Sequence, residues 1–149
     1  MGGAISQLLG NQILRVSLLG WFIAQSLKVV HTLITEKRIN FRRFVGAGGM
    51  PSSHSAFVTS LATAIGQAEG WGASVTALAW VFAMVVMYDA AGVRRAAGRQ
   101  AEVLNRIVDD LYHGGRLRED RLKELLGHTP VEVVAGALLG IVVALVAWR

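Results

Sequence analysis

The sequence contains no cysteine and few charged residues. Zero cysteines among 149 residues exclude a disulfide scaffold, a thiolate metal site and a cysteine nucleophile. Charged residues make up only 17% of the chain, whereas hydrophobic residues make up 53% and the mean hydropathy is +0.47. Long repeats and low-complexity segments are absent from the sequence as well. A water-soluble domain needs less apolar sequence than this, so the composition indicates a membrane protein.

The apolar residues lie in blocks. Val16–Ile34, Trp71–Tyr88 and Val131–Trp148 are each long enough, at about 1.5 Å per helical residue, to cross the hydrocarbon core. Ser55–Ala68 is shorter and rich in small polar residues, so a buried or re-entrant helix is the alternative to a crossing. The first block lacks the basic start and cleavage site of a signal peptide. We therefore predict one all-α, membrane-embedded domain over 1–149, a bundle of about four transmembrane helices with spans near 14–34, 53–70, 71–89 and 130–148.

The basic residues are concentrated in two polar segments. Residues 36–50 and 89–128 hold 12 of the 15 lysines and arginines. With four spans both segments fall on one side of the membrane, which the positive-inside rule identifies as cytoplasmic. We therefore predict cytoplasmic-side segments at 35–52 and 90–129, with short surface helices at 101–112 and 116–127, in an inner or plasma membrane protein. The net charge of +5 fits an anionic lipid surface better than nucleic acid, which is not an expected partner.

Two short motifs at this face carry groups with catalytic potential. Pro51-Ser52-Ser53-His54-Ser55 opens the second span and is typical of a helix start, where a serine caps the helix or the exposed amides bind an anion such as phosphate. His128 and Glu132 are four residues apart, so on a helix they share one face. The carboxylate would then orient the imidazole as a nucleophile or base. The alternative is that Thr129-Pro130-Val131-Glu132 is a capping box and Glu132 serves the helix alone.

Other polar residues near the two motifs have two interpretations each. Arg94 and Arg95 are either phosphate clamps or the basic flank of a span. Asp89 ends an uncharged span and needs a cationic partner or a function, and Lys28 lies inside the first span, where it serves the structure or contacts a ligand. In the last span the G-x-x-x-G pair predicts a close helix contact, within the bundle or between subunits, which leaves a homo-oligomer open; its residues are Gly136 and Gly140.

Three segments together carry a family resemblance. GGMPSSHS, MYDAAGVRRAAGRQAEVLN and LKELLGHTPVEV, in this order, resemble the small membrane proteins described as the divergent PAP2 family, relatives of the type 2 phosphatidic acid phosphatases and vanadium-dependent haloperoxidases. The likeness extends from the lysine of AQSLK at 24–28 through the last span. Only the PSSHS element closely matches the P-S-G-H pattern of the wider superfamily.

The resemblance implies a lipid phosphate phosphatase. Ser52 and the Ser53 amide would hold the phosphate, His54 would be the general acid, and His128 would attack phosphorus with Glu132 in the place of the orienting aspartate. Arg94 or Arg95 would bind phosphate oxygens. The first superfamily motif, Lys followed seven residues later by Arg-Pro, is absent, so Lys28, Lys37, Arg42 and Arg43 are alternatives for its cations, of which we favour Lys28 and Arg43.

The expected substrate is a lipid phosphomonoester such as phosphatidylglycerol phosphate or phosphatidic acid, cleaved at the cytoplasmic face. No metal is required by the scheme, although Asp89, Glu132 and a histidine leave a divalent cation open as a cofactor. The rival predictions are a non-catalytic module that binds anionic lipid or a protein through its basic face, and a small transporter that uses Lys28 and Asp89 as intramembrane charges.

Overall fold

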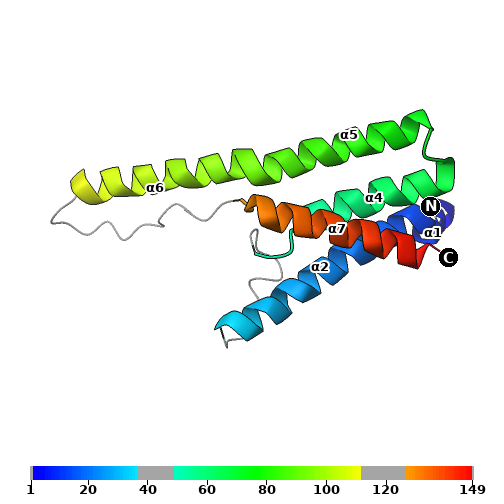
Figure 1. Ribbon diagram of the computed structural model, residues 1–149, viewed down its shortest axis with the longest axis horizontal. Helices are drawn as coiled ribbons and strands as arrows, with labels where there is room; N and C mark the ends of the chain where they lie inside the picture. Colours follow the sequence, from blue (N-terminus) through cyan, green and yellow to red (C-terminus); the bar gives the residue numbers. More distant parts are fainter. Residues whose placement is uncertain (1, 37–48, 112–126, 149) are drawn as a thin grey trace.

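The computed structural model describes residues 2–36, 49–111 and 127–148, and all regular structure in these ranges is helical (Figure 1). The predicted all-α fold class is therefore confirmed. The elements, in chain order, are α1 (Gly2–Gly10), α2 (Gln12–Glu36), α4 (Ser53–Glu69), α5 (Ser74–Tyr88), the π-helical turn η1 (Asp89–Val93), α6 (Arg94–Leu111) and α7 (Pro130–Ala147).

Helix α4 lies at the centre of the bundle, and α2, α5 and α7 each pack against it. Its buried residues are all small or of medium size, and many carry hydroxyl groups. The Thr59 hydroxyl donates to the carbonyl of Ser55 at 2.8 Å on its own helix and lies 3.0 Å from the carbonyl of Ala137 on α7. Hydroxyls that bond backbone carbonyls can be buried in a membrane bundle without a large desolvation cost. The buried serines and threonines of α4 are therefore packed between helices.

The G-x-x-x-G pair of α7 also packs on α4. A Cβ atom at Gly136 would overlap the backbone carbonyl of Ser52, and one at Gly140 would overlap Thr59 and the carbonyl of Ala56. Both glycines therefore allow a close approach of two helix backbones. Of the two alternatives that the sequence left open, the structure places this contact within the chain.

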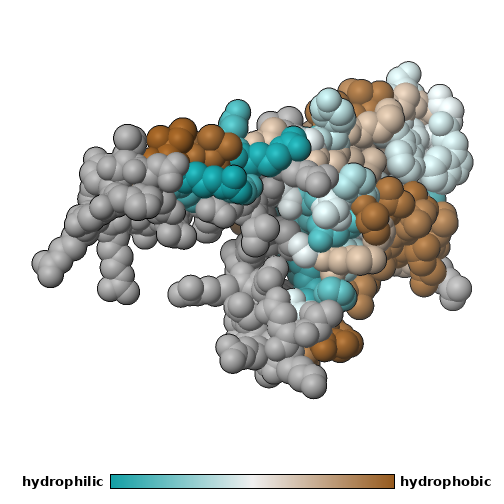
Figure 2. All heavy atoms as spheres, turned by 60° about the vertical axis from the view of Figure 1, so that its left-hand side comes forward, coloured by the Kyte–Doolittle hydropathy of each residue, from teal (hydrophilic) through white to brown (hydrophobic). Residues whose placement is uncertain are grey.

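Three helices among the described residues are long and apolar enough to cross a membrane: Gln12–Ile34, Pro130–Ala147 and a helix over Ser74–Val108 that includes α5. They carry exposed Leu, Val, Phe and Met side chains, and Figure 2 shows apolar side chains over much of the bundle. Helix α4 is not among the three, because it is only 17 residues long and polar along its buried face. The chain is an integral membrane protein. Crossing of the membrane by α4 stays a prediction, which is supported by its position between longer helices.

Helices α5 and α6 form one long rod joined by η1 (Figure 1). The segment 101–112 was expected as a short separate helix, but its described part belongs to α6, which begins seven residues earlier at Arg94. No proline interrupts this stretch, and a π turn keeps the helical hydrogen bonding continuous. The rod extends past the starts of α4 and α7, away from the chain termini. The second expected surface helix, at 116–127, lies outside the described residues except for Gly127.

Candidate functional site

The starts of α4 and α7 lie side by side. The backbone N–H of Ser52, just before α4, donates to the carbonyl of Glu132 on the first turn of α7 at 2.9 Å. The N–H of His128 donates to the carbonyl of Ala90 in η1, also at 2.9 Å. These two bonds bring together three segments that are far apart in the sequence. They are the same three segments that the predicted topology placed at one membrane face.

His128 and Glu132 form a side-chain pair. The Nδ1 atom of His128 lies 3.2 Å from the Oε2 atom of Glu132, and the histidine side chain is 1% exposed. The same Oε2 accepts the N–H of Thr129 at 2.9 Å, while the Thr129 hydroxyl accepts the N–H of Glu132 at 3.3 Å. The capping box is therefore complete and Glu132 also contacts the histidine. Glu132 thus makes both the helix-cap contact and the histidine contact, since one carboxylate oxygen has lone pairs for both partners.

His54 lies on the first turn of α4 and faces His128. The two imidazole rings are 5.8 Å apart between centroids, with their planes inclined by 64°. His54 is half-buried, so it is the more accessible of the two rings. Two histidines in contact at the ends of separate helices can both reach one small ligand. The predicted topology placed both histidines at one membrane face, and in the structure their rings are in contact.

The serines before and within the first turn of α4 are buried. Ser52 is the N-cap, and its hydroxyl oxygen accepts the N–H of Ser55 at 3.3 Å and the Ser55 hydroxyl at 3.0 Å. The capping interpretation of Ser52 is therefore confirmed. Ser55 has a part in this arrangement that the sequence reasoning did not give it, although its spacing of three residues from the N-cap was a usable signal.

Lys28 reaches the same place from α2. Its side chain is 2% exposed, and its Nζ atom donates to the Ser53 hydroxyl at 3.0 Å. The side chain therefore does not snorkel to the membrane surface but points into the bundle, toward the starts of α4 and α7. The buried ammonium therefore lies at the start of α4, where it contacts the residue that precedes His54.

The structure describes the other predicted site residues only in part. Arg94 and Arg95 are the first two residues of α6, but their side chains lie outside the described part of the structure, as does all of Arg43. Asp89 is half-buried and is the first residue of η1. The contact between η1 and His128 is made by the neighbouring Ala90 carbonyl. Among the described residues, no group of three or more acidic or histidine side chains has an arrangement that would hold a metal ion.

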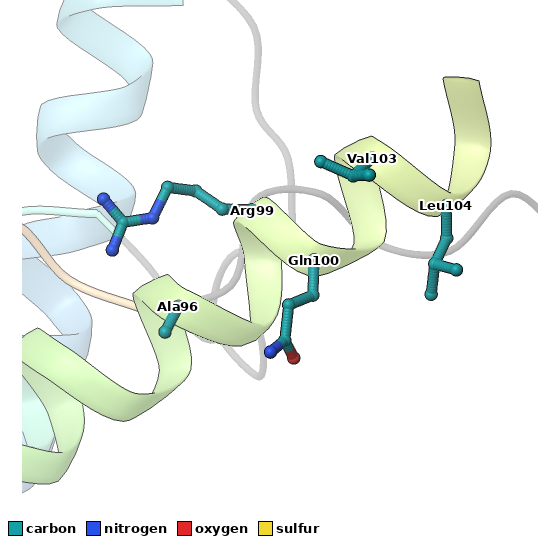
Figure 3. A pocket seen from close by; sticks show the side chains of 5 residues that line it. All are labelled: Ala96, Arg99, Gln100, Val103 and Leu104. Atoms are coloured by element: carbon teal, nitrogen blue, oxygen red, sulfur yellow. The ribbon is translucent and has the colours of Figure 1, made fainter. Parts of the chain in front are cut away.

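Two surface hollows are lined by residues of α5, α6 and α7. The larger, about 610 Å³, lies on α6 away from the histidines and is lined by Arg99 and its neighbours Ala96, Gln100, Val103 and Leu104 (Figure 3). All five come from successive turns of one helix, so this hollow is an open surface rather than a pocket. The second, about 400 Å³, lies between α5 and α7 and includes Val133, the residue that follows Glu132.

The part of the chain that matches known proteins includes the whole candidate site. The family model described as "Divergent PAP2 family" matches residues 9–143, a range that includes Lys28, His54, His128 and Glu132. The chain is also similar to the "Uncharacterized membrane protein YuiD" of Bacillus subtilis (strain 168), with 40% identity over 151 residues that cover 94% of this chain and 96% of that protein. No solved structure matches this chain.

Proposed function

The chain belongs to the divergent PAP2 family, and from this premise we propose that it is a phosphatase that hydrolyses a lipid-borne phosphomonoester at the cytoplasmic face of the membrane. The observation that carries the proposal is the meeting of Lys28, His54 and the His128–Glu132 pair, from three separate helices, at one point. Phosphatidic acid and phosphatidylglycerol phosphate are candidate substrates. Hydrolysis of a phosphate monoester is among the slowest uncatalysed reactions, so it needs both an activated nucleophile and neutralisation of charge.

In the first step, His128 is the nucleophile. In the tautomer with the proton on Nδ1, which faces Glu132, the ring lone pair is on Nε2, and this atom attacks phosphorus. The new N–P bond forms as the bond between phosphorus and the lipid oxygen breaks, and His54 donates a proton to that oxygen. The products are a phosphohistidine and a lipid alcohol. Glu132 stabilises the positive charge that develops on the His128 ring.

In the second step, water cleaves the phosphohistidine. His54, now neutral, accepts a proton from the water that attacks phosphorus, and the N–P bond breaks. Inorganic phosphate leaves, and both histidines return to their starting states. Lys28 and the backbone amides at the start of α4, including that of Ser53, stabilise the phosphoryl oxygens in both steps.

The proposal is tested by measuring phosphate release from a panel of lipid phosphates by the detergent-purified protein, with and without Mg²⁺. We expect activity in the wild type and loss of activity in His128→Ala and His54→Ala. Far-UV circular dichroism and gel filtration establish that the variants are folded. Equal activity in all three proteins, or no release from any lipid by the wild type, would refute the proposal.

A second candidate is a non-catalytic module that binds anionic lipid through its basic face. It is favoured by the exposed surface of α6, where Val103, Leu104, Ile107 and Val108 lie beside Arg99 and Arg106. Such an amphipathic helix binds anionic membrane surfaces. In this case, reversing the charge at Arg94, Arg95 and Arg99 would abolish the binding of anionic vesicles to protein reconstituted in nanodiscs, whereas alanine at His54 and His128 would leave cellular function intact.

A further inference from the structure

An apolar groove runs between α5 and α7 on the membrane side of the candidate site. Its volume is about 400 Å³, and its lining consists of Met84, Met87, Tyr88, Val133, Val134, Ala137 and Leu138. The groove exists because α5 and α7 both pack on α4 more than on each other. Met84 and Leu138 are more than half exposed at its rims, whereas Val133 is 8% exposed at its floor.

One end of the groove meets the candidate site. The hydrogen bond from the His128 N–H to the Ala90 carbonyl links the two walls at this end. Tyr88, on one wall, lies two residues before Ala90, and Val133, on the floor, directly follows Glu132. A molecule in the groove would therefore have its nearer end beside the proposed nucleophile.

We propose that this groove binds the hydrocarbon chain of the lipid whose phosphate is hydrolysed. The inference rests on the proposed function, because the site supplies the place where the headgroup is held. The groove opens between two helices of membrane-spanning length, so the surrounding solvent is hydrocarbon. Six of its seven lining residues carry no polar side-chain group, and the Tyr88 hydroxyl is the exception. A polar occupant would leave its hydrogen-bonding groups unsatisfied there, whereas an acyl chain would not.

The groove differs from an ordinary lipid-facing surface because one of its ends meets the candidate site. Binding the first part of the acyl chain would fix the distance between the phosphate and His128. The free energy of acyl-chain binding would then serve to orient the reacting phosphate. Ala137 has the smallest side chain of the lining, and a larger side chain there would fill the groove. Val146 is an exposed residue of the same helix that does not line the groove.

The test is photo-crosslinking in nanodiscs with phosphatidic acid that carries a diazirine near the glycerol end of one acyl chain, followed by peptide mass spectrometry. We expect labels on α5 and α7 residues of the groove in the wild type. The label should fall at least about fivefold in Ala137→Trp, and it should stay at the wild-type level in the matched control Val146→Trp. Met84→Trp blocks the groove from its exposed rim, so it serves if Ala137→Trp does not fold.

Crosslinking reports binding without hydrolysis, so the two proposals fail separately. Labels spread evenly over the outward faces of α2, α5 and α7, or labels unchanged by both groove variants, would overturn the groove as the chain site even if the protein releases phosphate. Labels confined to the groove in a protein that releases no phosphate would support the groove and refute the phosphatase. In active protein we also expect the KM for phosphatidic acid to rise about tenfold in Ala137→Trp, and not in Val146→Trp.

Discussion

The imidazole rings of His54 and His128 contact each other edge to face, 5.8 Å apart between centroids. They are positioned by the starts of two different helices, which the backbone hydrogen bond from Ser52 to Glu132 holds together. The two rings are not equivalent, since Nδ1 of His128 contacts a carboxylate and its side chain is almost fully buried. In the proposed reaction this asymmetry assigns nucleophilic attack to His128 and proton transfer to His54.

The role of His54 predicts an effect that depends on the leaving group. We expect His54→Ala to lower kcat/KM for phosphatidic acid by roughly 10²–10⁴-fold, the usual contribution of a general acid. For p-nitrophenyl phosphate the loss should be much smaller, because nitrophenolate leaves without a proton. The measurement is kcat/KM for both substrates in the same detergent, because kcat/KM reports phosphoryl transfer and not the later hydrolysis, in which His54 also acts. A loss of equal size for both would show that His54 does not protonate the leaving group.

The two contacts of Glu132 can be separated by mutation. Glu132→Gln keeps an oxygen that can cap the N–H of Thr129 but loses the charge that faces His128. We expect activity to fall roughly 10–10³-fold, because a carboxylate both orients and stabilises the imidazolium, while the apparent Tm stays close to the wild type. Activity and thermal unfolding in detergent are measured on the same preparation.

Thr129→Ala is the matched control for Glu132. It removes the hydroxyl that accepts the N–H of Glu132 and leaves the contact between Glu132 and His128 in place. Loss of an N-cap side chain costs about 1 kcal/mol, so the apparent Tm should fall while activity per folded protein is retained. The opposite pattern, a stability loss in Glu132→Gln with full activity, would make the capping box the sole role of Glu132.

The sequence predicted the elements of the site better than their contacts. Local patterns are sufficient to place His54 at a helix start and His128 four residues before Glu132, and the positive-inside rule places both motifs at one face. Whether Glu132 contacts His128 in addition to capping the helix depends on where the imidazole of His128 lies. That position is set by the three-dimensional path of the residues before α7.

Two further features lay beyond sequence reasoning for physical reasons. A lysine inside a span can snorkel outward or turn inward, and the hydropathy of α2 is the same in both cases, so the contact between Lys28 and Ser53 could not be predicted. Likewise, a G-x-x-x-G pair shows that a neighbour approaches closely without saying which neighbour. The contacts of Gly136 with Ser52 and of Gly140 with Thr59 answer that question.

Lys28 is expected to contribute to anion binding more than to stability. Lys28→Met keeps the length of the side chain and removes a buried charge, and replacing buried charges by apolar groups is often neutral or stabilising. A charge-assisted hydrogen bond to phosphate is worth about 1.5–3 kcal/mol, so inhibition by orthovanadate should weaken by roughly tenfold to a hundredfold. The inhibition constant and the apparent Tm are measured together.

Thr32→Val is the matched control for Lys28. Thr32 is also buried on α2, one turn further along the same helix, and valine has nearly its shape. We expect no change in vanadate inhibition in this variant. If vanadate inhibits Lys28→Met as strongly as the wild type, or if inhibition weakens equally in both variants, Lys28 does not contact the anion and its role in the site is structural.

The last prediction compares the two glycines of α7 that pack on α4. Alanine at either position would overlap backbone atoms, Ser52 for Gly136 and Ala56 for Gly140, so the helices must separate. Overpacking of this kind costs about 1–3 kcal/mol, and the apparent Tm should fall in both variants at a fixed scan rate. Gly10→Ala, which would meet no atom within 4 Å, should leave the apparent Tm unchanged.

Only Gly136→Ala should also lower activity per folded protein, because Ser52 is the cap of the helix that carries His54. Equal activity in Gly136→Ala and Gly140→Ala would mean that the position of Ser52 does not control the site.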